Sequence, residues 1–236
     1  MATGFEYLLT KQNIQSTVEQ VLVPQVELFL NRAWDRLNPL LPSGDSNQTN
    51  YSKDDILLLL LLFTAWLDGE WLDEFSAAFV SQVEAANEIE RAFWEKNGYP
   101  IPDGVQDSVA EAFSSQRDWK RIADVTINRT VTGILRWDAA EGLVRRDLNE
   151  LLSYWYSRSR AQNIASSETT ALNSILTKEY MDRLGLRRWV WWTTPPEWSI
   201  CSFCRGNHGV TFDIADPMPP DASHPHCKCV PEVLFD

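Results

Sequence analysis

The spacing of apolar residues along the chain predicts mostly helices. From Phe5 to Leu37, apolar side chains recur every three or four residues, the period of an amphipathic helix, and we expect Pro24 to interrupt this segment. A further helix is expected to run to about Lys96, where the sequence Asn-Gly-Tyr-Pro ends it. Residues 105–143 supply one or two more helices. We therefore expect a helical N-terminal region.

A polar segment and a leucine-rich segment lie inside this region. Residues 39–51 are rich in proline, serine and asparagine and predict a linker. Ser52, with Asp55 three residues later, predicts the cap of a helix that begins at Ile56. The apolar run continues only to about Leu67, which is too short to span a bilayer. We expect this run to be buried, either within the chain or against a neighbouring subunit.

The last third of the chain predicts a helix followed by a strand. From about Arg145 to Leu184, apolar residues again recur at helical spacing, as in one amphipathic helix or a helix pair, and Gly185 supplies the stop. The sequence Trp-Val-Trp-Trp-Thr-Thr favours a strand, which Pro195 and Pro196 end. We expect its tryptophans to form the core of a small domain.

These patterns predict a mainly α protein with a helical region, residues 1–143, and a small α+β C-terminal domain, residues 144–236. The chain has 236 residues, of which 44% are hydrophobic, so it can bury a core in one or two domains. Its eleven tryptophans indicate large contact surfaces in addition to a core. The chain begins MATGFEYLL, which has no feature of a signal peptide, so we expect no export.

The net charge of -12 opposes general binding to nucleic acid or to an anionic membrane. Between residues 145 and 188, however, eight basic residues outnumber five acidic ones. The basic residues are Arg145, Arg146, Arg158, Arg160, Lys178, Arg183, Arg187 and Arg188. This surplus indicates a solvated helix face that complements an acidic partner or the acidic N-terminal half of the chain. The alternative is contact with DNA.

All four cysteines and all three histidines lie between Cys201 and Cys229. The preceding 200 residues contain neither type, so the crowding indicates that these side chains act together to hold a metal ion. The C-x-x-C spacing of Cys201 and Cys204 directs two thiolates at one ion, and further donors follow about twenty residues later. The candidate ligands are Cys201, Cys204, His224, Cys227 and Cys229.

Five donors compete for four tetrahedral positions. The preferred set is Cys201, Cys204, His224 and one of Cys227 or Cys229, and both of these cysteines are ligands if His224 is not. His208 and His226 are expected to face solvent or to bond a backbone carbonyl. The alternatives to a metal site are disulfides, as in a secreted protein, and free thiols.

The residue pattern favours a structural ion over a catalytic one. A catalytic zinc keeps an open position beside a base, and no acidic residue between residues 201 and 229 has a spacing such as H-E-x-x-H. A cysteine nucleophile would leave the other thiols without a role. The chain also lacks a Walker loop, G-x-G-x-x-G and G-x-S-x-G. We therefore predict a protein that is not an enzyme, with a structural Zn²⁺ that folds its proline-rich tail.

The last third combines a helix, a glycine turn, a tryptophan-rich strand, C-x-x-C, a short hairpin and the closing motif His224-Pro225-His226-Cys227-Lys228-Cys229. In this combination, residues 160–229 resemble the C-terminal domain of the phage Mu F-like head morphogenesis proteins, also called minor head proteins. The other matching positions are Ser167, Glu168, Thr169, Asn173 and Tyr180 on the helix, Gly185 at the turn, Trp189 and Trp192 on the strand, Gly209 and Val210 in the hairpin, and Pro219 and Pro220 before the closing motif.

The resemblance implies a structural minor head protein of a tailed bacteriophage that acts by binding, without turnover. Its expected partners are the portal protein and the major capsid or scaffolding protein, with a weak contact to packaged DNA and none to a membrane. Its expected location is the virion, at the capsid interior or the portal vertex, and the host cytoplasm during assembly. The alternatives are a zinc-dependent nucleic-acid-processing or toxin-like enzyme that uses Glu168 and the histidines, and a DNA-binding module that uses residues 145–188.

Overall fold

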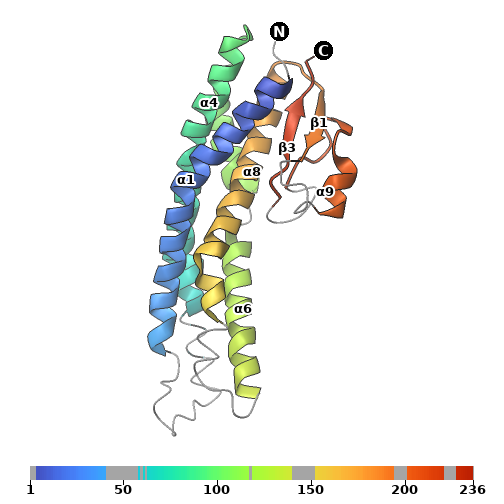
Figure 1. Cartoon of the computed structure of the whole chain (residues 1–236). Helices are drawn as coiled ribbons and strands as arrows, with labels where there is room; N and C mark the ends of the chain where they lie inside the picture. Colours follow the sequence, from blue (N-terminus) through green and yellow to red (C-terminus); the bar gives the residue numbers. More distant parts are fainter. Residues whose placement is uncertain are drawn as a thin grey trace. The chain divides into compact units, whose positions relative to one another are not determined.

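The chain is mainly helical, with a three-stranded sheet near its C-terminus (Figure 1), which confirms the predicted fold class. The computed structural model describes residues 4–40, 58, 61, 63–116, 119–139, 152–193, 201–220 and 227–235. Its helices are α1 (Gly4–Leu37), α3 (Leu72–Val80), α4 (Gln82–Lys96), α5 (Val105–Gln116), α6 (Trp119–Ala139), α8 (Arg158–Arg183) and α9 (Ser202–Asn207). Its shorter helical turns are η1 (Asn38–Leu40), η2 (Leu67–Trp71) and η3 (Tyr154–Tyr156), and its strands are β1 (Arg188–Trp192), β2 (Thr211–Asp213) and β3 (Val230–Val233).

The chain folds into two compact units, each assembled from segments that are distant in the sequence. Unit 1 comprises Met1–Leu22, Phe79–Arg117 and Asn163–Asp236, and unit 2 comprises Val23–Ala78 and Asp118–Gln162. Helices α1 and α8 therefore contribute residues to both units. The division in chain order between residues 143 and 144 stays a prediction, because this boundary lies outside the described residues.

In unit 1, α8 is the most deeply buried helix, although most of its buried residues are small or polar. Its side chains from residue 164 to residue 174 are all buried. Small side chains let neighbouring segments approach the helix from several directions. The buried hydroxyl groups of Thr169 and Thr177 each donate to the carbonyl four residues earlier, at 2.8 Å. The Thr170 hydroxyl lies 2.9 Å from the carbonyl of Ser166 and closer, at 2.7 Å, to that of Cys227, so burial leaves none of the three without a partner.

The end of α8 and the strand after it form as predicted. Gly185 has a φ of +72°, and the amide of Leu186 donates to the carbonyl of Met181 at 2.8 Å, which is the hydrogen bond of a Schellman cap. Strand β1 then lies between β2 and β3 and is antiparallel to both. Alternation along β1 buries Trp189 and Trp191 almost completely. These two side chains form a core, as the sequence indicated.

In unit 2, aromatic side chains form the core. Phe75 stacks on Trp71 with ring centroids 4.6 Å apart, and Phe29 contacts both rings edge-on. Of the predicted leucine run, Leu58 and Leu61 are 57% and 67% exposed, so these two residues are not buried within the chain. Their burial against another subunit stays a prediction.

The prediction that Pro24 interrupts the first helix is wrong, because α1 runs from Gly4 to Leu37 with Pro24 inside it. Proline removes one hydrogen bond from a helix interior, and a helix that is buried along its length retains enough packing to continue through it. The predicted linker, apart from Pro39 and Leu40, and the cap at Ser52 lie outside the described residues. Within the described part of the chain, no helix has the length and apolar character to cross a membrane.

Candidate metal centre

The C-x-x-C sequence lies at the start of α9. Cys201 is the N-cap residue of this helix, and its sulfur accepts a hydrogen bond from the amide of Cys204 at 3.3 Å. A sulfur at this position satisfies one of the amide groups that a helix leaves without a partner in its first turn. The local fold of the motif therefore brings the sulfur of Cys201 against the backbone of Cys204.

The second pair of cysteines lies immediately before β3. Cys227 and Cys229 are two residues apart, and both are buried. The Thr170 hydroxyl on α8 bonds the carbonyl of Cys227 at 2.7 Å, and the Ser174 hydroxyl bonds the carbonyl of Pro219. Residues 219 and 227, on either side of a segment outside the described residues, are thus attached to the same helix.

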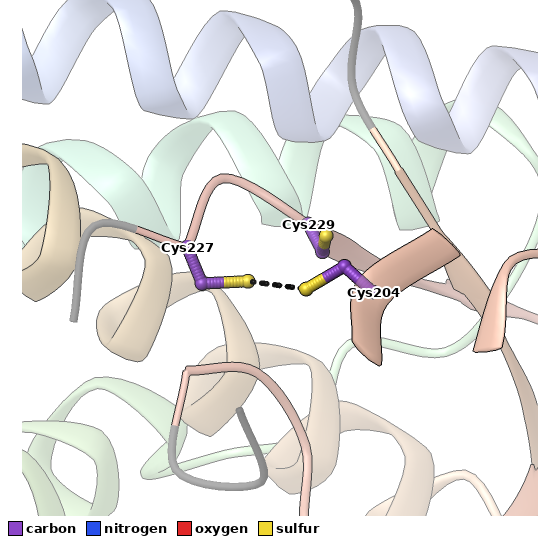
Figure 2. A group of neighbouring side chains, drawn as sticks. All are labelled: Cys204, Cys227 and Cys229. Atoms are coloured by element: carbon purple, nitrogen blue, oxygen red, sulfur yellow. Dashed lines mark hydrogen bonds between the residues drawn. The ribbon is translucent and has the colours of Figure 1, made fainter. Parts of the chain in front are cut away.

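Three thiols converge at this point. The sulfurs of Cys204, Cys227 and Cys229 all lie within 4.8 Å of one another, and the side chains of all three are buried. Figure 2 shows Cys204 and Cys227 pointing toward each other from separate segments, with their sulfurs 3.7 Å apart. Two sulfurs bound to one tetrahedral zinc are about 3.8 Å apart, given a zinc–sulfur bond of about 2.3 Å. The arrangement therefore has the dimensions of a metal site.

Burial and mutual contact keep the thiols of Cys204 and Cys229 protonated when no cation is bound. Burial, followed by the hydrogen bond to Cys201, raises the pKa of Cys204 to about 12. The hydrogen bond to Cys227, followed by burial, raises the pKa of Cys229 far above its usual value. Thiols with such raised pKa values become thiolates when a bound cation replaces their protons. All four cysteines are free, so the disulfide alternative does not describe this structure.

A buried indole group beside the cluster fits a bound cation. The Nε1 atom of Trp191 is buried and has no hydrogen-bond partner. It faces Cys229 closely enough to lower the pKa of that thiol, against the larger effects that raise it. An indole N–H is only a donor, and a metal-bound thiolate is the acceptor that would satisfy it. The donor set and its surroundings therefore fit a metal ion.

Of the remaining predicted ligands, Cys201 contacts Cys204, and His224 lies outside the described residues. Cys201 is not among the three sulfurs that lie within 4.8 Å of one another. His224 falls outside the described residues, as does His226. His208 is exposed and lies over the ring of Trp192 at 4.7 Å, and its Nδ1 bonds Thr193. The structure thus brings together three of the five predicted ligands, and the complete set stays a prediction.

The local surplus of positive charge is partly matched by acidic neighbours. Arg183 pairs with Glu179 at 2.6 Å, and Arg187 lies 3.7 Å from Asp182. Arg158 lies 3.7 Å from Glu27, a residue of the N-terminal half. These pairs agree with the view that the basic residues complement acidic groups of the chain.

Sequence reasoning missed a buried polar network in unit 1. Lys11 and Glu90 are both fully buried and form an ion pair at 2.6 Å. The other oxygen of Glu90 accepts hydrogen bonds from the Tyr7 hydroxyl at 2.7 Å and from the Trp94 indole at 3.2 Å. The sequence did indicate that Lys11 is buried, because this residue lies at helical spacing between the apolar residues Tyr7 and Ile14, on the same face of the helix.

Comparisons of the chain with protein-family models, with curated proteins and with solved structures give no match.

Proposed function

We propose that this chain is a minor head protein of a tailed bacteriophage, a structural component that binds the portal protein during procapsid assembly. The major capsid or scaffolding protein is the second proposed partner, and packaged DNA is a minor contact. The proposed location is the virion, at the capsid interior or the portal vertex, and the host cytoplasm during assembly. Its action is binding and placement, without turnover.

The observation that supports this proposal most directly is the packing of the residues that carry the family resemblance. Ser167, Thr169 and Asn173 are all buried on α8. The same helix bonds the carbonyl of Cys227, in the closing motif, and the carbonyl of Pro219, in the preceding proline pair. Motifs that are distant in the sequence therefore belong to one folded unit, as the resemblance requires.

The proposed ion is Zn²⁺ in a structural site. Cysteine thiolates favour zinc, and buried ligands without an open position are typical of structural sites. The cation would hold the start of α9 against the segment before β3, where the buried thiols of Cys204, Cys227 and Cys229 already meet. Cys201 and His224 are the two candidates for the fourth ligand.

The enzyme alternative assigns chemistry to Glu168. This side chain is 5% exposed on α8, among buried residues on both sides in the sequence. If the Glu168 carboxylate has a structural role, Glu168→Gln should be less stable than the wild type. A catalytic carboxylate would instead give a folded variant that has lost a nuclease or transferase activity of the wild type.

The experiment that tests the proposal is co-expression of the tagged chain with the portal protein encoded by the same genome, followed by size-exclusion chromatography. We expect the two proteins to elute as one complex. The variant Cys204→Ala removes a ligand of the proposed ion. If the metal centre shapes the binding surface, we expect this variant to form a weaker complex with the portal protein. Separate elution of the wild-type chain and the portal protein would overturn the proposal.

A further inference from the structure

Arg160, in the first turn of α8, is buried in unit 2 and has no acidic partner among the residues that the structure describes. Its side chain is 8% exposed, and its Nη2 donates to the hydroxyl oxygen of Thr126 at 2.6 Å, which is a neutral acceptor. Its Nε is buried and has no hydrogen-bond partner. Arg160 makes no ion pair with any residue in the described part of the chain. No described residue therefore compensates the guanidinium charge.

The neighbouring hydroxyl groups cannot supply the missing negative charge. The Thr126 hydroxyl donates to the carbonyl of Ile122 at 2.8 Å, and the Thr130 hydroxyl donates to the carbonyl of Thr126 at 2.8 Å. Because the proton of Thr130 is used in this way, Tyr156 must be the donor in its 2.7 Å contact with Thr130. Burial raises the pKa of Tyr156, which keeps its phenol neutral.

Further positive charge gathers at the same place. The guanidinium carbon of Arg129 lies 5.0 Å from the centre of the Trp155 ring, and that of Arg160 lies 5.1 Å from the same centre. The first turn of α8 contains no acidic residue and also carries Arg158, which lies 3.7 Å from Glu27. In this turn the amide of Arg160 donates to the Ser157 hydroxyl at 3.3 Å, so the helix N-terminus adds chiefly the partial positive charge of its dipole. Two guanidinium groups thus contact one indole ring, that of a residue just before the start of α8.

Such an arrangement is unfavourable in isolation. Burial, more than any other effect, lowers the pKa of Arg160, and nearby Arg129 lowers it further. A lowered pKa means that the charged form of the side chain is less stable here than in water. A buried charge is normally paired, and an unpaired one beside a second arginine and a helix N-terminus calls for an anion. Arg129 is exposed, so an anion can reach this end of the site from solvent.

We propose that the N-terminus of α8, together with Arg160, Arg129 and Trp155, is a binding site for a phosphate-class oxyanion. A phosphate group carries up to two negative charges and several acceptor oxygens, which suits two guanidinium groups and a helix N-terminus. A single carboxylate would neutralise only one of the two arginines. The site lies entirely in unit 2, and it does not depend on the proposed function.

The test measures binding of inorganic phosphate to the full chain by isothermal titration calorimetry, at constant ionic strength maintained with chloride. We expect saturable binding of the wild type. Arg160→Met removes the buried charge and keeps its volume, and Arg129→Gln removes the exposed charge. Each should weaken phosphate binding at least about tenfold, as expected for the loss of a charge-assisted hydrogen bond. The control, Arg187→Gln, makes the same charge change in unit 1 and should bind like the wild type.

Thermal unfolding of the same proteins separates specific binding from a general salt effect. Phosphate stabilises many proteins by exclusion from their surface, and this effect would persist in every variant. We expect the gain in Tm of the wild type over chloride to shrink in Arg160→Met and Arg129→Gln alone. An equal gain in all four proteins, or undiminished binding in Arg129→Gln, would overturn the proposal. Arg129→Gln alone decides the test if Arg160→Met fails to fold.

A short oligonucleotide, titrated in parallel, identifies the source of the oxyanion. If a nucleic acid supplies it, the oligonucleotide binds more tightly than inorganic phosphate, and Arg160→Met weakens both. If a free phosphate supplies it, inorganic phosphate binds and the oligonucleotide does not compete. Oligonucleotide binding that Arg160→Met and Arg129→Gln leave unchanged would contradict a role for this site in nucleic-acid binding.

Discussion

Replacing Lys11 with methionine tests how much the buried ion pair contributes to unit 1. The pair joins α1 to α4 with both side chains fully buried and an Nζ–Oε2 distance of 2.6 Å. Burial lowers the pKa of Lys11, and the Glu90 carboxylate opposes this effect. Lys11→Met keeps most of the side-chain volume and leaves Glu90 buried without its cation. Breaking a buried pair in this way costs about 3–5 kcal/mol.

The loss expected for Lys11→Met is large compared with the total free energy of unfolding of a protein, which is about 5–15 kcal/mol. It corresponds to a decrease in Tm of roughly 10 °C for a protein of this size. The double variant Lys11→Met/Glu90→Gln removes both charges, and glutamine can still accept hydrogen bonds from the Tyr7 hydroxyl and the Trp94 indole. We expect it to recover most of the loss, because replacing both members of a buried pair is often nearly neutral.

Urea unfolding followed by circular dichroism, together with amide hydrogen exchange in α4, measures the effect in unit 1. The matched control is Lys96→Met, which removes the exposed pair with Glu6, 3.4 Å apart, whose side chains are 72% and 41% exposed. We expect this control to change the stability by less than about 1 kcal/mol. A loss below about 1 kcal/mol in Lys11→Met, or a double variant no more stable than the single one, would refute the reasoning.

Three further predictions concern the metal centre and the buried tyrosines. Trp191→Phe keeps the ring but removes the indole donor, and should weaken metal affinity about tenfold in a competition with a chromophoric chelator, whereas Trp192→Phe should not. Thr170→Val leaves the carbonyl of Cys227 without its donor and should lower the stability by about 1–3 kcal/mol in thermal unfolding. Thr169→Val, whose hydroxyl bonds only its own helix among the described residues, should cost less. Burial raises the pKa of Tyr7, Tyr156 and Tyr180, so from about pH 10 upward the unfolded chain loses protons that the native chain keeps. Stability should therefore fall above that pH, and the part of the absorbance rise at 295 nm that belongs to these three of the six tyrosines should come only on unfolding; ionisation of all six tyrosines before unfolding would contradict this.

The local elements of the fold could be predicted from the sequence because short-range chemistry determines them. Helix α4 ends at Lys96, before the predicted breaker sequence, and Gly185 ends the cap of α8. The strand at residues 188–192 follows from its aromatic and β-branched residues. Pro24 misled the prediction because packing along a long helix outweighed one lost hydrogen bond.

The assembly of the two units could not be predicted, because it depends on contacts between residues far apart in the chain. The pair Lys11 and Glu90 illustrates this point, since each residue alone reads as an ordinary charged position on a helix. Arg160 was expected to be one of a row of basic residues on a solvated face. Its burial depends on α6, where Thr126 accepts its hydrogen bond.

The candidate site was predicted in part. Clustering of the cysteines indicated that they act together, and Cys204, Cys227 and Cys229 do converge. Spacing alone did not reveal that Cys201 caps α9 and lies outside the group of three converging sulfurs, where it is one of the two candidates for the fourth ligand. The unpaired indole of Trp191 had no signal in the sequence beyond its place on a buried strand.

Metal analysis of the purified chain tests the central claim most directly. Inductively coupled plasma mass spectrometry of the wild type should give about one zinc per chain, the content of a single tetrahedral site. Cys204→Ala and Cys229→Ala should contain much less zinc, whereas Ser202→Ala, an exposed neighbour on α9, should match the wild type. A wild-type chain that is folded and free of metal after purification without chelators would contradict the account, as would zinc content that Cys204→Ala leaves unchanged.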